Sequence, residues 1–476
     1  MAYKRGQEVL RDPKPFSYVV TPKYRKIVCD CCLKMCKSEG ILRACAKCKW
    51  VYYCDQTCQK GAWKSHHKLE CKYLQKQNVL SKNLKVVSRA FDEDFEDTPG
   101  TLLVLKLLKV ILKLNKMKEE GKEEFFQLPN GKKRRFDDLV SNADELRKQK
   151  EVTNDPNKLK LNHLYFIYKD FEIWLEDAIQ IPTFTEFFEI YGKWQTNCTS
   201  IFALDFDDPF ISIARGLYLG YTSLDHSCAP NAVWFNVGKE MIVRTIEDVI
   251  QYSDIRISCF YMIEKTHERK KYLQEHYFFD CKCVRCEDPK SDAKYSSLKC
   301  KFCSGWVPES TKICSSCNQR LKLNQEELTI VEKYKNDTLT KFEPTNEEIR
   351  SDLEKLTKVF HVFHEIFRYP EELFVFPKGV SPIQNGNHND MLLLLEVRKL
   401  RMNHRSAYIP QYYQDFVFDH SEISNTCISL KLFDEAKSHL KKAEEIIKVV
   451  YGEDHPYMRD CQKRKMELLC ACLSLK

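Results

Sequence analysis

Closely spaced cysteines constrain this chain more than any other feature. The 476 residues include 23 cysteines, most of which fall in short-range pairs. A gap of two residues lets two thiolates turn back onto one cation, and a tetrahedral zinc site needs two such arms. The first residues of the chain are charged where a secretory signal needs an apolar stretch, so export is not expected. The cysteine pattern therefore predicts metal binding and not disulfides.

The first group of cysteines lies in residues 29–71 and ends with two histidines and a last cysteine. Its candidate ligands are Cys29, Cys32, Cys45, Cys48, Cys54, Cys58, a histidine (His66 or His67) and Cys71. Eight ligands make two tetrahedral sites, so about forty residues can fold around metal with little apolar core.

Two further groups follow. The sequence DCKCVRC supplies three thiolates within six residues, and an isolated upstream cysteine is the candidate fourth; a later pair of CxxC motifs is typical of a self-contained zinc ribbon. The members are Cys228, Cys281, Cys283 and Cys286 in the first group, and Cys300, Cys303, Cys314 and Cys317 in the second. Together the groups predict four zinc ions and leave eight cysteines unassigned.

Length and composition set wider limits. A chain of 476 residues is too long for one compact core, so two to four domains are expected. The net charge of +8 permits an acidic partner but does not require one. The most apolar stretch, TLLVLKLLKVILKL, carries Lys106, Lys109 and Lys113 on one helical face. This spacing predicts a buried amphipathic helix and not a membrane span.

The order of motifs resembles one known family. The segment YYCDQTCQKGAWKSHHKLEC resembles a MYND zinc finger, and it is followed by HSCAPN (residues 226–231) and by YFFDCKCVRC (residues 277–286). A chain with these three motifs in this order is similar to the SET- and MYND-domain (SMYD) lysine methyltransferases. The resemblance implies an α+β fold in which a MYND finger and a helical insertion split the small β-sheets of a SET core. A zinc-bound post-SET segment and an all-α, TPR-like C-terminal domain follow.

The resemblance also implies how the finger's ligands interleave. Cys29, Cys32, Cys54 and Cys58 would bind one zinc, and Cys45, Cys48, a histidine and Cys71 the other. The family spacing is stretched by one residue here. His67 keeps the distance to Cys71, whereas His66 keeps the distance from Cys58, and we prefer His67. Cys31 and Cys36 are left as free thiols.

The family plan divides the chain into six parts. We expect a partial N-terminal SET segment (1–28), the MYND finger (29–71), the helical insertion (72–190), the SET core (191–265), a post-SET and zinc-ribbon-like segment (266–325) and the helical domain (326–476). Within this plan AVWFNVGKEMIVRTIEDV alternates around a turn and predicts a hairpin of the SET core. DEAKSHLKKAEEIIKVVYGEDHP resembles one TPR-type helical hairpin.

The resemblance further implies S-adenosylmethionine as cofactor. Its pocket would be formed by Asn142, Asn197, Ser223, Leu224, Asp225, His226 and Phe279, with Tyr277 as a catalytic wall. The chemistry is methyl transfer from a sulfonium to a neutral lysine amine. A free lysine has a pKa near about 10.4, so the site has to desolvate the amine and align it with the methyl group.

Three departures from the family lie at this chemistry. Asp225 stands where the family has an asparagine. Reading without gaps from Arg244 to Leu273, Cys259 stands where the family has a catalytic tyrosine, and Tyr261 lies two residues further on. A glycine-rich turn that the family places before the segment GQEVLRDPKPFSYVV is absent from the sequence, which therefore reads as divergent and N-terminally short.

The resemblance leaves two functions open. One is an S-adenosylmethionine-dependent methyltransferase acting on lysines of histones or other proteins, which the family's activity favours. The other is a catalytically inactive scaffold that binds partners through the finger and the helical domain.

A MYND finger implies docking of proline-containing peptides, and without C2H2 spacing direct DNA binding is not favoured. We expect a monomer located in cytoplasm and nucleus; GKKRR (131–135) reads either as an import signal or, preferably, as a solvated loop.

Overall fold

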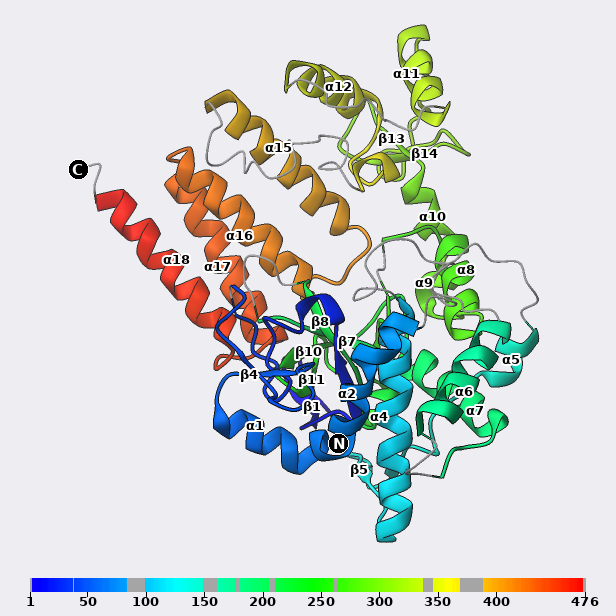
Figure 1. Ribbon diagram of the computed structural model, residues 1–476. Coiled ribbons are helices and arrows are strands. Elements are labelled where there is room, and N and C mark those ends of the chain that lie inside the picture. Colours follow the sequence, from blue (N-terminus) through cyan, green and yellow to red (C-terminus); the bar gives the residue numbers. More distant parts are fainter. Residues whose placement is uncertain are drawn as a thin grey trace.

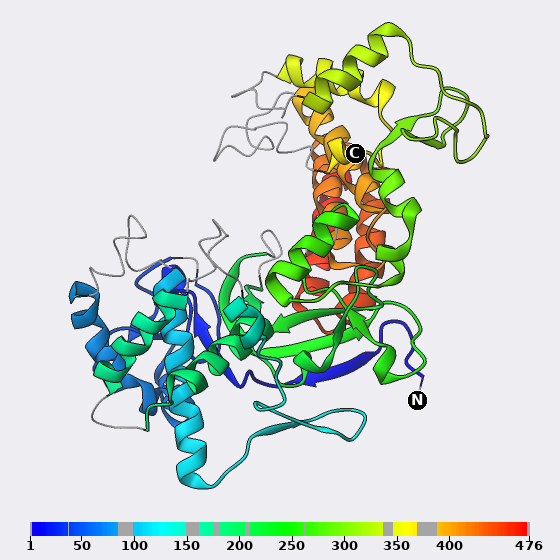
Figure 2. The ribbon, with the colours of Figure 1, turned by 90° about the vertical axis from the view of Figure 1, so that its right-hand side faces the viewer.

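The fold combines many helices with several small β-sheets, as predicted. The computed structural model describes residues 2–36, 38–83, 99–148, 161–175, 180–204, 210–260, 263–336, 346–368 and 388–473. Figure 2 shows the small sheets at a corner between two arms. One arm holds the N-terminal finger and the helices that follow it; the other holds the C-terminal helices and the zinc ribbon. The predicted fold class is confirmed.

Three small sheets form the centre of the molecule (Figure 1). The first has the order β1-β11-β10 and is antiparallel, the second has the order β2-β8-β7 and is antiparallel, and the third pairs β9 with β12 in parallel. Their bounds are β1 Glu8–Asp12, β2 Ser17–Val20, β7 Cys198–Phe202, β8 Ser212–Leu217, β9 Asp225–His226, β10 Ala232–Val237, β11 Glu240–Thr245 and β12 Arg256–Ile257. The predicted hairpin is confirmed, because β10 and β11 pair with Val237 opposite Glu240.

Alternation of side chains explains why these strands form sheets. In β7 the residues alternate between half-buried and buried, which places Cys198 and Ser200 on one face and Ile201 on the other. Ile201, Ala214 and Met241 are fully buried in a shared core beneath the sheets. Gly238 in the β10–β11 turn has φ +59°, a conformation that favours glycine.

The finger and the insertion contribute mainly helices. Their bounds are α1 Gln56–Ala62, a π-helical turn Trp63–His67, α2 Lys68–Asn83, α4 Pro99–Glu120, α5 Ala143–Lys148, α6 Leu161–Leu175 and α7 Phe184–Asn197, with short hairpins β3 Arg43–Ala44 with β4 Tyr52–Tyr53 and β5 Phe125–Gln127 with β6 Lys133–Arg135. The helix predicted from TLLVLKLLKVILKL is confirmed as part of α4. The loop preferred for GKKRR was wrong, since Lys133–Arg135 form strand β6 of an exposed hairpin.

The C-terminal half carries the remaining elements. Their bounds are α8 Thr266–Tyr277, α9 Val284–Glu287, α10 Pro289–Tyr295, β13 Ser297–Lys299, β14 Trp306–Pro308, α11 Gln325–Asn336, α12 Asn346–Val359, α15 His388–Arg405, α16 Gln414–Ser429, α17 Phe433–Val450 and α18 Pro456–Leu473. Short 3-10 turns occupy Pro22–Tyr24, Tyr221–Ser223, Tyr252–Asp254 and Glu365–Phe367. Helices α16, α17 and α18 lie side by side in Figure 1. Among the described residues, no helix combines the length and the apolar character that crossing a membrane requires.

Candidate functional site

The structure gathers the finger's cysteines into two groups. Cys29, Cys32, Cys54 and Cys58 form one, and Cys45, Cys48, His67 and Cys71 the other; in each, the ligand atoms lie within 4.8 Å of one another. The Nε2 atom of His67 is 3.3 Å from Cys45 Sγ. The π-helical turn that contains His67 carries it towards the buried cysteines, whereas the neighbouring His66 contacts Asp30 instead.

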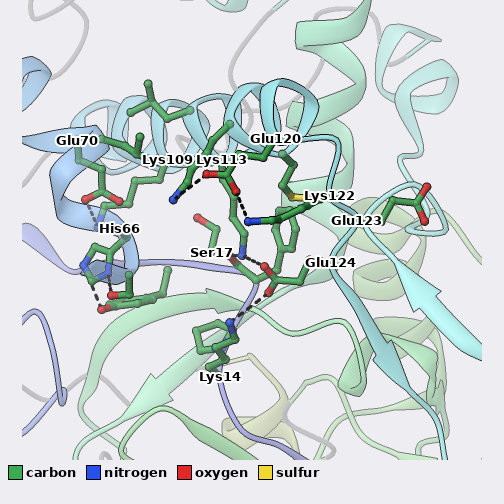
Figure 3. A pocket seen from close by; sticks show the side chains of 18 of the residues that line it. Lys14, Ser17, His66, Glu70, Lys109, Lys113, Glu120, Lys122, Glu123 and Glu124 are labelled. Atoms are coloured by element: carbon green, nitrogen blue, oxygen red, sulfur yellow. Dashed lines mark hydrogen bonds and ion pairs between the residues drawn. The ribbon is translucent and has the colours of Figure 1, made fainter. Parts of the chain in front are cut away.

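Helix α4 is joined to the finger by a buried ionic network (Figure 3). The Lys109 ammonium lies 3.1 Å from Glu70 and 3.8 Å from Asp30, and all three side chains are buried. His66 Nε2 lies 2.9 Å from the second oxygen of Asp30. A cleft of about 420 Å³ opens beside this network, and the network fixes the finger against the insertion.

A third cysteine group forms where the chain's centre meets α9. Cys228, Cys281, Cys283 and Cys286 bring their sulfur atoms within 4.8 Å of one another. Four thiolates on one zinc ion leave an excess of negative charge, and a buried charge needs a counter-charge. Arg269, which is fully buried, donates to Cys286 Sγ at 3.5 Å and supplies that counter-charge.

The fourth group is the zinc ribbon. Cys300, Cys303, Cys314 and Cys317 also lie within 4.8 Å of one another, between β13 and the start of α11. The backbone N–H groups of Phe302, Gly305 and Ser316 point at ligand sulfur atoms at 3.3–3.4 Å, as in a preformed thiolate site. All four groups have the donor number and the donor chemistry of structural zinc sites.

His226 connects the third zinc group to the candidate cofactor site. It lies in β9, and its Nε2 atom is 3.3 Å from Cys228 Sγ. On the other side its Nδ1 atom accepts the backbone N–H of Cys259 at 3.3 Å. Burial lowers the pKa of His226 to about 4, so the ring is neutral near pH 7. The histidine is therefore fixed between a zinc ligand and the turn after β12.

Asn142 joins the insertion to the end of α8. Its side-chain amide donates to the Tyr277 carbonyl and to the Thr196 hydroxyl, both at 3.2 Å. The backbone of Asn142 has φ +48°, a left-handed conformation that asparagine tolerates better than most residues. The Asn197 amide donates to the Val140 carbonyl at 2.7 Å, which ties the end of α7 to the same loop. The structure thus brings the two predicted asparagines together.

Aromatic rings close the opposite side of this site. The ring of Phe279 lies 5.9 Å from that of His226, and the ring of Phe260 lies 5.3 Å from it. The Tyr277 hydroxyl donates to the Cys259 carbonyl at 3.4 Å. Burial raises the pKa of Tyr277 well above its ordinary value, so its hydroxyl stays protonated and acts as a donor.

The other predicted cofactor residues lie next to His226. The Ser223 hydroxyl donates to the Gly220 carbonyl at 2.7 Å, and Leu224 packs against the core beneath the sheets. Asp225, by contrast, points outward: its side chain is 78% exposed and lies 3.9 Å from the Arg256 guanidinium. The carboxylate at this position is therefore both solvated and paired, so it carries no desolvation cost.

Cys259 and Tyr261 are the two candidates for the position of the family's catalytic tyrosine, and the structure describes only the first of them. Strand β12 ends at Ile257, so Cys259 lies in the turn that follows and not in the strand. Burial raises the pKa of the Cys259 thiol to about 12, which keeps it neutral. Tyr261 lies outside the described residues.

Sequence reasoning missed a charged group beside this site. Arg215 on β8 donates to Cys198 Sγ at 3.2 Å and to the Ser200 hydroxyl at 3.1 Å. Its charge acts on Tyr277, and it also lowers the pKa of Lys106 on α4. The available signal was an arginine between apolar residues of a strand, in ISIARGLYL.

Comparison with known proteins agrees with this arrangement. The MYND finger family model matches residues 29–71. N-lysine methyltransferase SMYD2-A of Danio rerio is 23% identical over 98% of this chain and 94% of its own length. Histone-lysine N-methyltransferase ASHR1 of Arabidopsis thaliana is 24% identical over 97% of this chain and 91% of its own length. Histone-lysine N-methyltransferase SMYD3 of Homo sapiens is 29% identical over 61% of this chain and 58% of its own length.

Two independent findings therefore agree: a zinc finger of the MYND type at the expected place, and lysine methyltransferase relatives that align along nearly the whole chain. The order of zinc groups, small sheets and C-terminal helices fits both. The chain contains a MYND finger and is similar along nearly its whole length to lysine methyltransferases of the SET- and MYND-domain-containing (SMYD) family.

Proposed function

We propose that this chain is an S-adenosylmethionine-dependent protein-lysine methyltransferase that acts on histones or other proteins. The observation that carries the proposal is the convergence of Asn142, His226, Cys259 and Tyr277, which come from distant parts of the chain. Hydrogen bonds link Asn142 to Tyr277, Tyr277 to Cys259, and Cys259 to His226. A zinc group at Cys228 anchors the last of them.

The residues of this site suit the cofactor. The side-chain oxygens of Asn142 and Asn197 and the backbone around His226 offer hydrogen bonds, and the ring of Phe279 offers an apolar face for an adenine. The cofactor supplies an electrophilic methyl group on a sulfonium. The chain's own residues bind the cofactor and the lysine, exclude water and hold the two in line.

The surroundings of Lys106 indicate what a substrate lysine meets here. Burial lowers the pKa of Lys106 to about 8, against the opposing effect of Cys198, and the charge of Arg215 contributes to the lowering. We propose that a substrate amine bound beside Arg215 meets burial and positive charge of the same kinds. Both favour its neutral form, which is the nucleophilic one.

Cofactor binding is expected to depend on Phe279. Phe279→Ala removes the aromatic face, and we expect affinity for S-adenosylmethionine to fall at least about tenfold, since buried aromatic contacts contribute on the order of 1–3 kcal/mol. Isothermal titration calorimetry on the zinc-loaded chain measures the change. Phe302→Ala is the matched control, because Phe302 is 65% exposed on the zinc ribbon. An equal loss in both variants would contradict the assignment of Phe279 to the cofactor site.

Cys259 provides the sharpest test of activity. Cys259→Tyr restores the hydroxyl and the ring wall that the family has at this position, and we expect methyl transfer to protein lysines to rise about tenfold or more. Transfer of labelled methyl groups to core histones measures the rate. Cys427→Ser is the control, because Cys427 is buried in the C-terminal helices. A rate that falls in the Cys259→Tyr variant would show that the thiol position has a different role.

One observation favours the second candidate function, a scaffold without catalytic activity. A neutral thiol at position 259 has a shorter reach and weaker hydrogen bonding than a tyrosine hydroxyl. In that case the chain binds partners through its finger, with proline-containing peptides as the expected ligands, and through its C-terminal helices. Absence of S-adenosylmethionine binding by calorimetry, with peptide binding retained, would identify the scaffold.

A further inference from the structure

Cys198 lies where two cationic side chains meet. It is the first residue of β7, and the Arg215 guanidinium of β8 donates to its sulfur at 3.2 Å. Ser200 holds the other end of that guanidinium at 3.1 Å, because Ser200 and Arg215 are directly paired in the sheet. Lys106 approaches from α4, and its charge also acts on the sulfur. The cysteine is thus one member of a three-residue charged cluster built from three elements.

The cluster has more positive charge than its neighbours can balance. Within the described part of the chain, no carboxylate forms an ion pair with Arg215 or Lys106, and the Arg215 Nε atom is buried without a hydrogen-bond partner. The Lys106 ammonium lies 6.0 Å from the centre of the Trp194 ring, which carries no counter-charge. A buried cationic group without a counter-charge is costly. A thiolate at Cys198 is the anion that the cluster itself offers.

We propose that Cys198 is a modification site, a thiolate nucleophile that reacts with hydroperoxides. The sulfur attacks the nearer peroxide oxygen, an S–O bond forms, and the O–O bond breaks. The sulfur is oxidised by two electrons to a sulfenic acid, and the departing hydroxide or alkoxide takes a proton from water. Arg215 stabilises the thiolate before attack. This proposal concerns the thiol alone and does not rest on methyl transfer.

The electrostatics of the cluster support this chemistry. Burial by itself raises the pKa of the Cys198 thiol, but the charges of Arg215 and Lys106 outweigh burial and the net shift is downward. The titratable groups that face Cys198 from other elements are Tyr191 on α7 and Tyr277 on α8. Burial raises the pKa of both tyrosines, so both stay neutral and neither competes for the arginine.

Cys198 differs from two other thiols of the chain, Cys259 and Cys427, in its charged surroundings and in the direction of its pKa shift. Cys198 is half-buried as a residue, whereas Cys427 is buried. Burial raises the pKa of Cys259 to about 12 and that of Cys427 to about 11, so these thiols are poor nucleophiles near pH 7. Reactive cysteines occupy electropositive, partly exposed surroundings. Cys198 has both properties, and the other two thiols have neither the positive surroundings nor the lowered pKa.

The test uses the full chain loaded with zinc. Iodoacetamide labelling from pH 5.5 to 9.5, read residue by residue by mass spectrometry, gives a titration midpoint for each thiol. We expect the Cys198 midpoint to lie below that of an ordinary free thiol, with Cys259 unlabelled up to pH 9. Hydrogen peroxide at pH 7 followed by dimedone should tag Cys198 ahead of Cys259 and Cys427.

Arg215→Met should move the Cys198 midpoint upward by about one unit and slow labelling at pH 7 by about three- to tenfold. Arg11→Met, at an arginine paired on the surface with Glu8 and Glu240, should change neither. Where Arg215→Met does not retain zinc, Lys106→Met makes the same comparison with a smaller shift. An ordinary midpoint in the unaltered chain, an unchanged midpoint in both variants, or no labelling of Cys198 before denaturation would each overturn the proposal.

Discussion

Stripping zinc from this chain is expected to unfold residues 29–71 and to release about four zinc ions per molecule. The finger's core contains four of its own ligands (Cys29, Cys45, Cys48 and Cys71) and few large apolar side chains. Structural zinc contributes on the order of 10–16 kcal/mol of apparent binding free energy, which exceeds the whole stability of a typical domain. Metal analysis and thermal melting with and without a strong chelator measure the effect. Unchanged melting after complete metal loss would contradict it.

Adjacent cysteines in the finger provide a matched pair of variants. Cys32 belongs to the first zinc group, whereas its neighbour Cys31 does not. Cys32→Ser should therefore lose one zinc ion and lower the melting temperature of the finger by at least about 10 °C. Cys31→Ser should keep all the zinc and melt close to the unaltered chain. Equal behaviour of the two variants would mean that the ligand set is wrong.

The sequence predicts the helices and strands of this fold better than it predicts which residues contact each face of a helix. The spacing of Lys106, Lys109 and Lys113 correctly predicts a helix, but spacing says nothing about which neighbour covers the lysines. In the structure each lysine enters a different contact: Lys106 the Cys198 cluster, Lys109 the finger, and Lys113 the Glu124 carboxylate at 2.7 Å. Their partners are distant in sequence, and no local pattern predicts them.

For the zinc groups, by contrast, the local spacing of residues does predict which side chains lie together. Spacing of cysteines is itself the geometry of the site, because a CxxC pair fixes two donors on one turn. Spacing left both His66 and His67 open with a preference for His67, and His67 is the histidine that the π-helical turn directs towards Cys45. Arg215 escaped notice because a single arginine in a strand is no motif, and its role depends on pairing with β7.

Lys109→Met is expected to lower the free energy of unfolding by about 3–5 kcal/mol, because removing one partner of a buried ionic network leaves the other charges unpaired. Asp30, Glu70 and Lys109 are 3%, 4% and 7% exposed. Burial alone would raise the pKa of Asp30, yet the charge of Lys109 and the hydrogen bond with His66 lower it to about 2. Without Lys109 the carboxylates of Asp30 and Glu70 remain buried where the finger meets α4, and Figure 3 shows Glu70 next to Lys109. Urea unfolding followed by tryptophan fluorescence measures the loss.

The same helix provides the control. Lys116 lies two turns further along α4, and its ion pair with Glu120 at 3.8 Å is exposed on both sides. Lys116→Met has the same change in composition and almost the same helix propensity, so it should cost less than about 0.5 kcal/mol. Adding Glu70→Gln to Lys109→Met should recover part of the loss, because it removes one of the charges left unpaired. If Lys109→Met and Lys116→Met lose equal stability, the network contributes nothing beyond the helix, and the finger is held to α4 by apolar packing alone.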